Sequence, residues 1–216
     1  MFEIQREFLN KFSKSDLKGD FYFTGGIALS LYYFNHRESD DIDLFCEKKE
    51  ALILQNIGEF FKKAGIKILN FNKKYDRRIY SVEIDNKPLK VEFVYYPFVR
   101  LFETNVFNKI RVDSLYDIIT NKVAALCDRE EEKDVFDIGF FIYKKGKDAF
   151  KKILNEFFDK KFGIPGCKYL VEKILASYEG KFDSIKLLGS VKREDIYENL
   201  QEFLKELVKE DIDENH

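Results

Sequence analysis

Apolar and polar residues along the first half of the chain follow two periodicities. Apolar residues three to four positions apart predict amphipathic helices, whereas short alternating or aromatic-rich runs predict strands. By these patterns we expect helices over residues 3–17, 27–34 and 48–64, and strands over residues 21–24, 41–47, 66–71, 77–84 and 88–96. Asp85-Asn86-Lys87 predicts the turn between the last two strands. Strands interleaved with helices in this way predict an α/β unit.

The pattern changes after about residue 112. Residues 114–129 and 133–145 have strong helical periodicity, and most of the remainder to residue 210 is helical as well. We therefore predict an α/β (α+β) protein with a lobe over residues 1–112, built on a twisted mixed sheet with flanking helices. A helical lobe over residues 113–216 follows, with a cleft shared between the two. The boundary is soft, because no flexible linker marks it.

Composition places the chain among globular proteins. Its 216 residues are 45% hydrophobic and 35% charged. No stretch approaches the roughly 20 apolar residues that span a bilayer, and the N-terminus lacks an apolar signal core, so we expect a cytoplasmic protein without a membrane partner. The cysteines lack metal or redox spacing and predict free thiols. The formal net charge of −2 argues against a protein coated for nucleic acid, although residues 1–112 have 19 Lys and Arg against 16 Asp and Glu.

Two carboxylates in the predicted strand over residues 41–47 are the first candidates for chemistry. Asp41 and Asp43 are two residues apart, so they point to the same face of the strand, whereas Asp40 is turned away. Two carboxylates about 7 Å apart repel each other unless a cation lies between them. Mg²⁺ typically takes one or two carboxylates and completes its shell with substrate phosphate oxygens. The alternative is a solvated strand face without a ligand.

Gly25-Gly26 lies between a predicted strand and a predicted helix, a short connection away from these carboxylates. Glycine allows the backbone to approach a phosphate closely, and a helix N-terminus offers free N–H groups. The pair therefore predicts a phosphate-binding bend beside a metal site. A simple tight turn is the alternative.

At this point the sequence resembles a known family, the AbiEii/AbiGii-type toxin nucleotidyltransferases of the polymerase-beta-like superfamily. The first block that carries the resemblance is Gly25-Gly26, a small-residue helix and then His36-Arg37-Glu38-Ser39-Asp40-Asp41-Ile42-Asp43-Leu44-Phe45. The second block is Lys122, Arg129 and then Lys133-Asp134-Val135-Phe136-Asp137. Ile27 stands where the family often has a hydroxyl residue, with Ser30 one turn on, and Cys127 stands where Ser or Thr is common.

The resemblance implies a function as well as a fold. It implies transfer of a nucleoside monophosphate from a nucleoside triphosphate (NTP) to an acceptor, with release of pyrophosphate. It also implies the toxin of a toxin–antitoxin pair, with a cognate antitoxin as partner and a use in phage defence. The favoured acceptor is RNA, at a tRNA 3′ end. The implied metal is Mg²⁺, with Mn²⁺ as the alternative.

The second block can also be interpreted physically. Lys122 lies on the apolar stripe of its predicted helix, where a buried ammonium needs an anionic partner such as a triphosphate. Snorkelling to the helix edge or pairing with a carboxylate is the alternative. Asp134 and Asp137 share one helix face, where Arg129 can pair with them. Asp137 is the candidate to orient Lys122 or the acceptor, and a structural salt-bridge network is the alternative.

Glu92, between two apolar residues on a probable central strand, is the candidate third metal ligand and proton acceptor, with Glu83 as the competitor. We thus assign catalysis to Asp41, Asp43, Glu92, Lys122 and Asp137, and metal binding to Asp41, Asp43 and Glu92. The residues assigned to substrate binding are Gly25, Gly26, Ser30, Arg37, Ser39, Lys122, Arg129 and Asp134. The alternatives to nucleotidyl transfer onto RNA are a protein-nucleotidylating (AMPylating-type) enzyme, a non-catalytic antitoxin-binding module and a metal-dependent nuclease.

Overall fold

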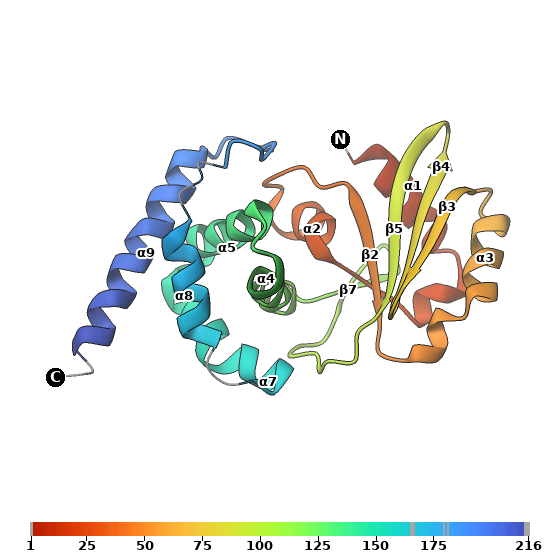
Figure 1. Cartoon of the computed structure of the whole chain (residues 1–216). Helices are drawn as coiled ribbons and strands as arrows, with labels where there is room; N and C mark the ends of the chain where they lie inside the picture. Colours follow the sequence, from red (N-terminus) through yellow and green to blue (C-terminus); the bar gives the residue numbers. More distant parts are fainter. Residues whose placement is uncertain (1, 165–166, 179, 181, 214–216) are drawn as a thin grey trace. The chain divides into compact units, whose positions relative to one another are not determined.

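The chain folds into two compact units. The computed structural model describes residues 2–164, 167–178, 180 and 182–213. The first unit is formed by Met1–Phe34, Ser39–Phe98 and Phe102–Leu115, and the second by Asn35–Glu38, Val99–Leu101 and Tyr116–His216 (Figure 1). The main change of unit falls at residues 115–116, close to the sequence-based boundary at residue 112. Two short segments of the predicted first lobe, residues 35–38 and 99–101, belong to the second unit.

A seven-stranded mixed sheet forms the centre of the first unit. Its strand order is β3-β4-β5-β2-β1-β7-β6, with β2 parallel to β5, β1 parallel to β7 and the other neighbours antiparallel. The strands are β1 (Tyr22–Thr24), β2 (Asp41–Cys46), β3 (Lys67–Lys74), β4 (Arg77–Ile84), β5 (Lys87–Tyr95), β6 (Asn105–Phe107) and β7 (Ile110–Val112). The mixed sheet confirms the predicted fold class.

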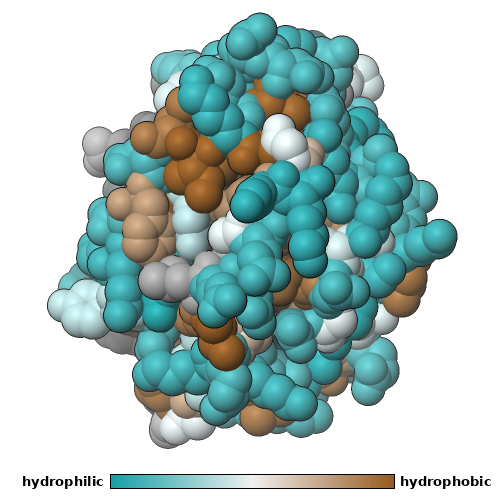
Figure 2. Space-filling view, turned by 90° about the vertical axis from the view of Figure 1, so that its right-hand side faces the viewer, coloured by the Kyte–Doolittle hydropathy of each residue, from teal (hydrophilic) through white to brown (hydrophobic). Residues whose placement is uncertain are grey.

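One face of this sheet is apolar because of strict alternation along β2. Ile42 and Leu44 are fully buried, whereas Asp41 and Asp43 between them are half-exposed. The buried face is covered by aromatic residues of α1 (Glu3–Phe12) and α3 (Leu54–Lys63). Figure 2 looks onto the side of the molecule where α3 and β3 lie, and this surface is mostly hydrophilic with small separate hydrophobic groups. The carboxylates are therefore presented on the sheet face opposite the helical cover.

The sequence placed most of these elements, and the structure refines three of them. The helix predicted over residues 3–17 ends as α1 at Phe12, and a 3₁₀ turn, η1 (Asp16–Gly19), follows. The helix predicted from residue 27 begins at Gly25 as α2 (Gly25–Ala28) and continues as a π-helical turn, η2 (Leu29–Phe34). The helix predicted from residue 48 is a 3₁₀ turn, η3 (Lys49–Leu52), and then α3.

Two turns differ from the sequence-based expectation. The β4–β5 turn contains only Asp85 and Asn86, both with positive φ, because Lys87 already pairs with Ile84. Such a pair of left-handed residues is typical of a two-residue hairpin turn. The β6–β7 hairpin was not predicted, because its strands have three residues each and are too short to show a period. Its turn at Asn108 and Lys109 again has positive φ at both residues.

The second unit is helical in its described residues, as predicted, apart from loops and one β-bridge between Arg37 and Leu187. Its helices are α4 (Leu115–Arg129), α5 (Glu132–Lys145), α6 (Lys147–Lys152), the π-helical turn η4 (Ile153–Phe157), α7 (Phe158–Phe162), α8 (Cys167–Ser177) and α9 (Arg193–Asp213). Helix α5 packs closely on α9, since a Cβ on Gly139 would lie 3.0 Å from Cγ2 of Ile196. Within the described ranges, no helix has both the length and the apolar character that membrane crossing requires.

Candidate functional site

Three carboxylates lie on one face of the sheet in the first unit. In the parallel pairing of β2 with β5, Asp43 is level with Glu92 and Asp41 is level with Lys90. Residues level with each other on paired strands point to the same face. Glu83, the competing candidate, lies on β4, two strands away from β2, and pairs with Lys67 at 3.0 Å. The register therefore brings Glu92, and not Glu83, beside Asp43.

Lys90 and Arg77 place positive charge among these carboxylates. The Lys90 ammonium is 2.7 Å from Oδ2 of Asp41 and 2.7 Å from Oε1 of Glu92. Arg77 Nη1 is 3.2 Å from the other oxygen of Glu92. Burial alone would lower the pKa of Lys90, but its hydrogen bonds to Asp41 and Glu92 raise that pKa above its usual value. The ammonium therefore stays charged and bridges two of the three carboxylates.

The Gly25 backbone closes the site from the side of α2. Gly25 has φ of +78°, a conformation that L side chains rarely adopt. A Cβ at this position would overlap Oδ2 of Asp43 and lie 2.9 Å from its Cγ. Glycine is thus required twice, by the backbone angle and by the Asp43 carboxylate. The predicted bend and the predicted metal ligand are next to each other.

The other residues of this unit that were predicted to contact phosphate differ in burial. Gly26 and Ser30 are buried, and Ser39 is half-buried in the loop before β2. Ile27, where the family often has a hydroxyl residue, is fully buried and belongs to the hydrophobic core. A role for Ser30 and Ser39 in substrate binding stays a prediction.

The predicted residues of the second block meet in the second unit, in a buried ionic cluster. Lys122 of α4 lies 2.8 Å from Asp134 Oδ1 and 3.0 Å from Asp137 Oδ2, both on α5. Arg129 reaches the other oxygen of Asp134 at 2.9 Å. Arg37 holds Asp137 with two nitrogens, at 2.6 Å and 2.7 Å. The side chains of Asp134 and Asp137 have no exposed surface.

His36 completes this cluster. Its Nε2 lies 2.8 Å from Asp137 Oδ1, and its ring packs against Phe136 and Phe140. Burial lowers the pKa of His36, against the opposing effect of Asp137, so the ring is neutral at physiological pH. Burial would raise the pKa of Asp137, but Arg37 and Lys122 hold it well below its usual value. The cluster thus contains an ionised Asp137 beside a neutral imidazole.

The sequence identified most of these residues but not their pairings. Arg37 was assigned to substrate binding, and the structure shows that its side chain and that of His36 both contact Asp137. Lys90 and Arg77 were not considered at all. Lys90 could have been found, because it lies two residues before Glu92 and shares its strand face. The shared cleft between the lobes stays a prediction.

No trio of His, Cys, Asp or Glu side chains among the described residues is already arranged to hold a metal ion. The chemistry of the first-unit carboxylates nevertheless fits a hard divalent cation, because all three residues offer carboxylate oxygens. The Lys90 ammonium shows where positive charge is held, between Asp41 and Glu92. The donor chemistry of these residues therefore suits Mg²⁺.

Comparison with known proteins identifies similar chains and similar folds. The chain is 27% identical over 208 residues to the uncharacterized protein aq_aa25 of Aquifex aeolicus (strain VF5), and the match covers 95% of each chain. Its fold is similar to that of JHP933 from Helicobacter pylori, with a TM-score of 0.58, 23% identity and coverage of 99% of this chain and 94% of the other. A candidate nucleotidyltransferase from H. pylori has a TM-score of 0.55 at 22% identity, over 96% and 94% of the two chains.

The decisive comparison is with a protein family. The family described as "Nucleotidyl transferase AbiEii toxin, Type IV TA system" matches residues 7–215, which is nearly the whole chain. Both sequence blocks lie within this match, which also covers most of each structural unit. The chain therefore belongs to the AbiEii family of nucleotidyl transferase toxins from type IV toxin–antitoxin systems, and it is a nucleotidyltransferase.

Proposed function

We propose that this protein transfers a nucleoside monophosphate from an NTP to a hydroxyl group of RNA, at a tRNA 3′ end. It does so as the toxin of a pair with a cognate antitoxin, in phage defence. The observation that carries this proposal is the register of β2 with β5, which sets Asp43 beside Glu92 while the Gly25 backbone lies against Asp43. Carboxylates beside a glycine bend suit a polyphosphate and its cation.

Asp41, Asp43 and Glu92 would hold Mg²⁺, with Mn²⁺ as an alternative. A bound divalent ion supplies neutralisation of phosphate charge and orients the phosphates for in-line displacement. The acceptor oxygen attacks the α-phosphorus, the bond to the β-phosphate oxygen breaks, and pyrophosphate leaves. In this proposal Glu92 accepts the proton of the acceptor hydroxyl. The chain forms no covalent intermediate, since positioning and electrostatics suffice for this class of reaction.

Lys90 belongs to this site in two states. Without a divalent ion its ammonium bridges Asp41 and Glu92, which offsets their mutual repulsion. When the carboxylates take a metal, the flexible lysine stem allows the ammonium to turn toward the phosphates. Lys90 is 44% exposed, so this movement opens no buried cavity.

The buried cluster of the second unit supports positioning rather than contact with substrate. The carboxylates of Asp134 and Asp137 have no exposed surface and already have partners. We propose that Asp137 orients Arg37 and Lys122 and fixes the segment that leads into β2. Arg129, which is 39% exposed, is the member of this group that can contact a phosphate.

The experiment is transfer of label from each α-³²P-labelled NTP to total RNA or purified tRNA in the presence of Mg²⁺. Asp43→Asn should abolish labelling, whereas Asp40→Asn should retain it. Asp40 is the matched control because it is exposed and lies just before β2. Labelling of protein instead of RNA would show that the acceptor is a protein. Release of nucleotide fragments from RNA without labelling would favour a nuclease, and wild type without activity on any NTP would favour a non-catalytic antitoxin-binding module.

A further inference from the structure

One pocket in the first unit has only basic residues among its charged lining residues. It has a volume of about 500 Å³ and lies between α1, the turn after α1, η2 and the β6–β7 turn. Its charged lining residues are Arg6, Lys14, Lys18 and Lys109. Among the described residues that line it there is no Asp or Glu, and none of the carboxylate-site residues belongs to its lining. We call the pocket lined by these four residues the basic pocket.

The charges of the basic pocket are not neutralised within the described part of the chain. Arg6, Lys14 and Lys109 are exposed and form no ion pair there, and Lys18 donates one hydrogen bond, to the backbone oxygen of Ser13 at 3.0 Å. Nearby acids of α1 have other partners: Glu7 pairs with Lys11 and Glu3 with Lys87. Four cations around one hollow repel each other, and an anion with several charges would relieve this repulsion.

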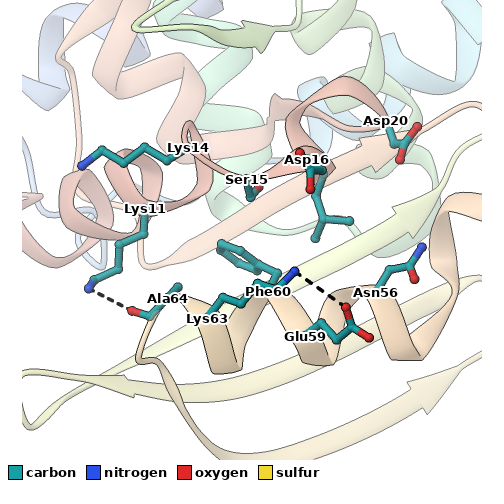
Figure 3. Close-up of a pocket in the computed structure, with 11 residues that line it drawn as sticks. Lys11, Lys14, Ser15, Asp16, Asp20, Asn56, Glu59, Phe60, Lys63 and Ala64 are labelled. Atoms are coloured by element: carbon teal, nitrogen blue, oxygen red, sulfur yellow. Dashed lines mark hydrogen bonds and ion pairs between the residues drawn. The ribbon is translucent and has the colours of Figure 1, made fainter.

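A neighbouring pocket of about 590 Å³ shows the contrast. It shares Lys14 with the basic pocket, but its lining balances three lysines with Asp16, Asp20 and Glu59 (Figure 3). In Figure 3 the Lys11 ammonium bonds to the Ala64 oxygen and Lys63 pairs with Glu59, whereas the Lys14 ammonium points away from Asp16 and Asp20. In this neighbouring pocket the acidic residues offset the lysines, so an anion is not needed to neutralise them. Uncompensated positive charge is a property of the basic pocket.

The chemistry of the lining favours phosphate groups over bases. Asn10 and Asn108 add amide donors, and the guanidinium of Arg6 can hold two phosphate oxygens at once. The Tyr32 ring is stacked on Phe107 at 4.5 Å and contacts Phe23, so it is not an open platform for a base. Burial raises the pKa of Tyr32 against the effect of Arg6, so its hydroxyl stays a neutral donor. These groups suit a backbone of phosphates and sugars.

We infer that the basic pocket is a docking site for the phosphodiester backbone of the acceptor RNA. The inference rests on the proposed function, in that the acceptor is taken to be RNA. The four cations come from three separate segments of the chain, which suits an extended polyanion better than a single phosphate. Docking at a distance from the carboxylates would hold a large RNA while its end reacts.

The test is binding of a fluorescein-labelled tRNA transcript, measured by anisotropy without NTP or divalent metal. The variant Arg6→Gln/Lys14→Gln/Lys109→Gln should weaken binding at least 10-fold at low salt. Its plot of log Kd against log salt should have a slope smaller by about 2, since each lost phosphate contact removes about 0.7–0.9. The control Lys62→Gln/Lys73→Gln/Lys74→Gln removes the same charge from exposed sites elsewhere in this unit and should weaken binding less than threefold.

Each outcome decides the inference. Equal losses in the two triple variants, or no loss in either, would overturn it. Polyglutamate that displaces the tRNA at an equal concentration of charge would assign the pocket to an acidic protein partner instead. Asp43→Asn should bind tRNA like wild type while transferring no nucleotide. A failure of nucleotidyl transfer is thereby separated from a failure of RNA docking.

Discussion

Each unit contains carboxylates that pair with a lysine and an arginine, and the two groups differ in burial. In the first unit Asp41 is 37% exposed and its partner Lys90 is 44% exposed. In the second unit the Asp137 side chain has no exposed surface, Arg37 is 4% exposed and Lys122 is 9% exposed. Water can replace the partner of Asp41 in the first group, although Glu92 there is buried. A missing partner in the second group leaves a charge without compensation in a medium of low dielectric constant.

The difference suggests how one chain uses the same residue types for two purposes. The pair of Asp41 and Lys90 is half-exposed, so under the proposed function a metal ion would take the place of the ammonium. We therefore call Asp41, Asp43, Glu92 and Lys90 the exchangeable group. The buried cluster is permanent, and it ties residues 35–38 to α4 and α5 inside one unit. These residues lead directly into β2. The buried charges are therefore part of the packing of the second unit.

The strongest way to break this comparison is to remove the central buried carboxylate. Asp137→Ala leaves Arg37 and Lys122 facing each other without their shared acid, and it should lower the free energy of unfolding by about 3–5 kcal/mol. Urea unfolding followed by circular dichroism measures this loss. Asp128→Ala, at an exposed acid of α4, should change the free energy by less than about 0.5 kcal/mol. An Asp137→Ala protein as stable as the control would show that the cluster is not structural.

Gly25→Ala tests the exchangeable group without changing a charge. The added Cβ forces the Asp43 carboxylate to move and strains a backbone with φ of +78°. We expect kcat/KM for nucleotidyl transfer to fall about 100-fold, which corresponds to roughly 2.7 kcal/mol. Gly58→Ala in α3 is the control, because its Cβ meets no atom within 4 Å. Equal activity of Gly25→Ala and wild type would show that the glycine bend is not part of the active site.

Lys90→Met sharpens the comparison by removing the ammonium from the exchangeable group. The carboxylates lose a resident cation, so affinity for Mn²⁺, measured by electron paramagnetic resonance of the free ion, should rise about 10-fold, or roughly 1.4 kcal/mol. Stability should fall by about 1 kcal/mol, because Asp41 is half-exposed and the buried Glu92 keeps Arg77 as a partner. Lys74→Met, an exposed lysine of β3, controls for net charge. Weaker Mn²⁺ binding in Lys90→Met would mean that the lysine orients the ligands.

The sequence predicted those features of the two charged groups that depend on the spacing of residues within one helix or strand. Alternation along one strand placed Asp41 and Asp43 on a common face, and helical spacing placed Lys122 and Asp137 on apolar helices. The register of β2 with β5 is a pairing between distant segments, so Glu92 and Glu83 could not be separated beforehand. The Lys90 bridge depends on that same register.

Long-range partners also explain why the units of the structure are not continuous along the chain. Arg37 and Asp137 are a hundred residues apart, and no local pattern joins them. Continuity of the chain therefore placed residues 35–38 in the first lobe, whereas their ion pairs place them in the second unit. The β6–β7 hairpin was missed for a different reason, because strands of three residues carry too little periodicity to detect.

The smallest predicted effect is a pH dependence of the buried cluster that the exchangeable group does not share. Burial lowers the pKa of His36 below its unfolded value of about 6.5, so its contribution to stability is present above that pH. That contribution is lost as the pH falls through the folded pKa, with a slope of at most about 1.4 kcal/mol per pH unit for one proton. His36→Gln should flatten the dependence of unfolding free energy on pH between 6.5 and 5. The flattening should appear equally in a Lys90→Met background, because the two groups lie in different units. An unchanged slope in His36→Gln would show that another residue takes up the proton. His36 would then not be a neutral imidazole that becomes protonated on unfolding.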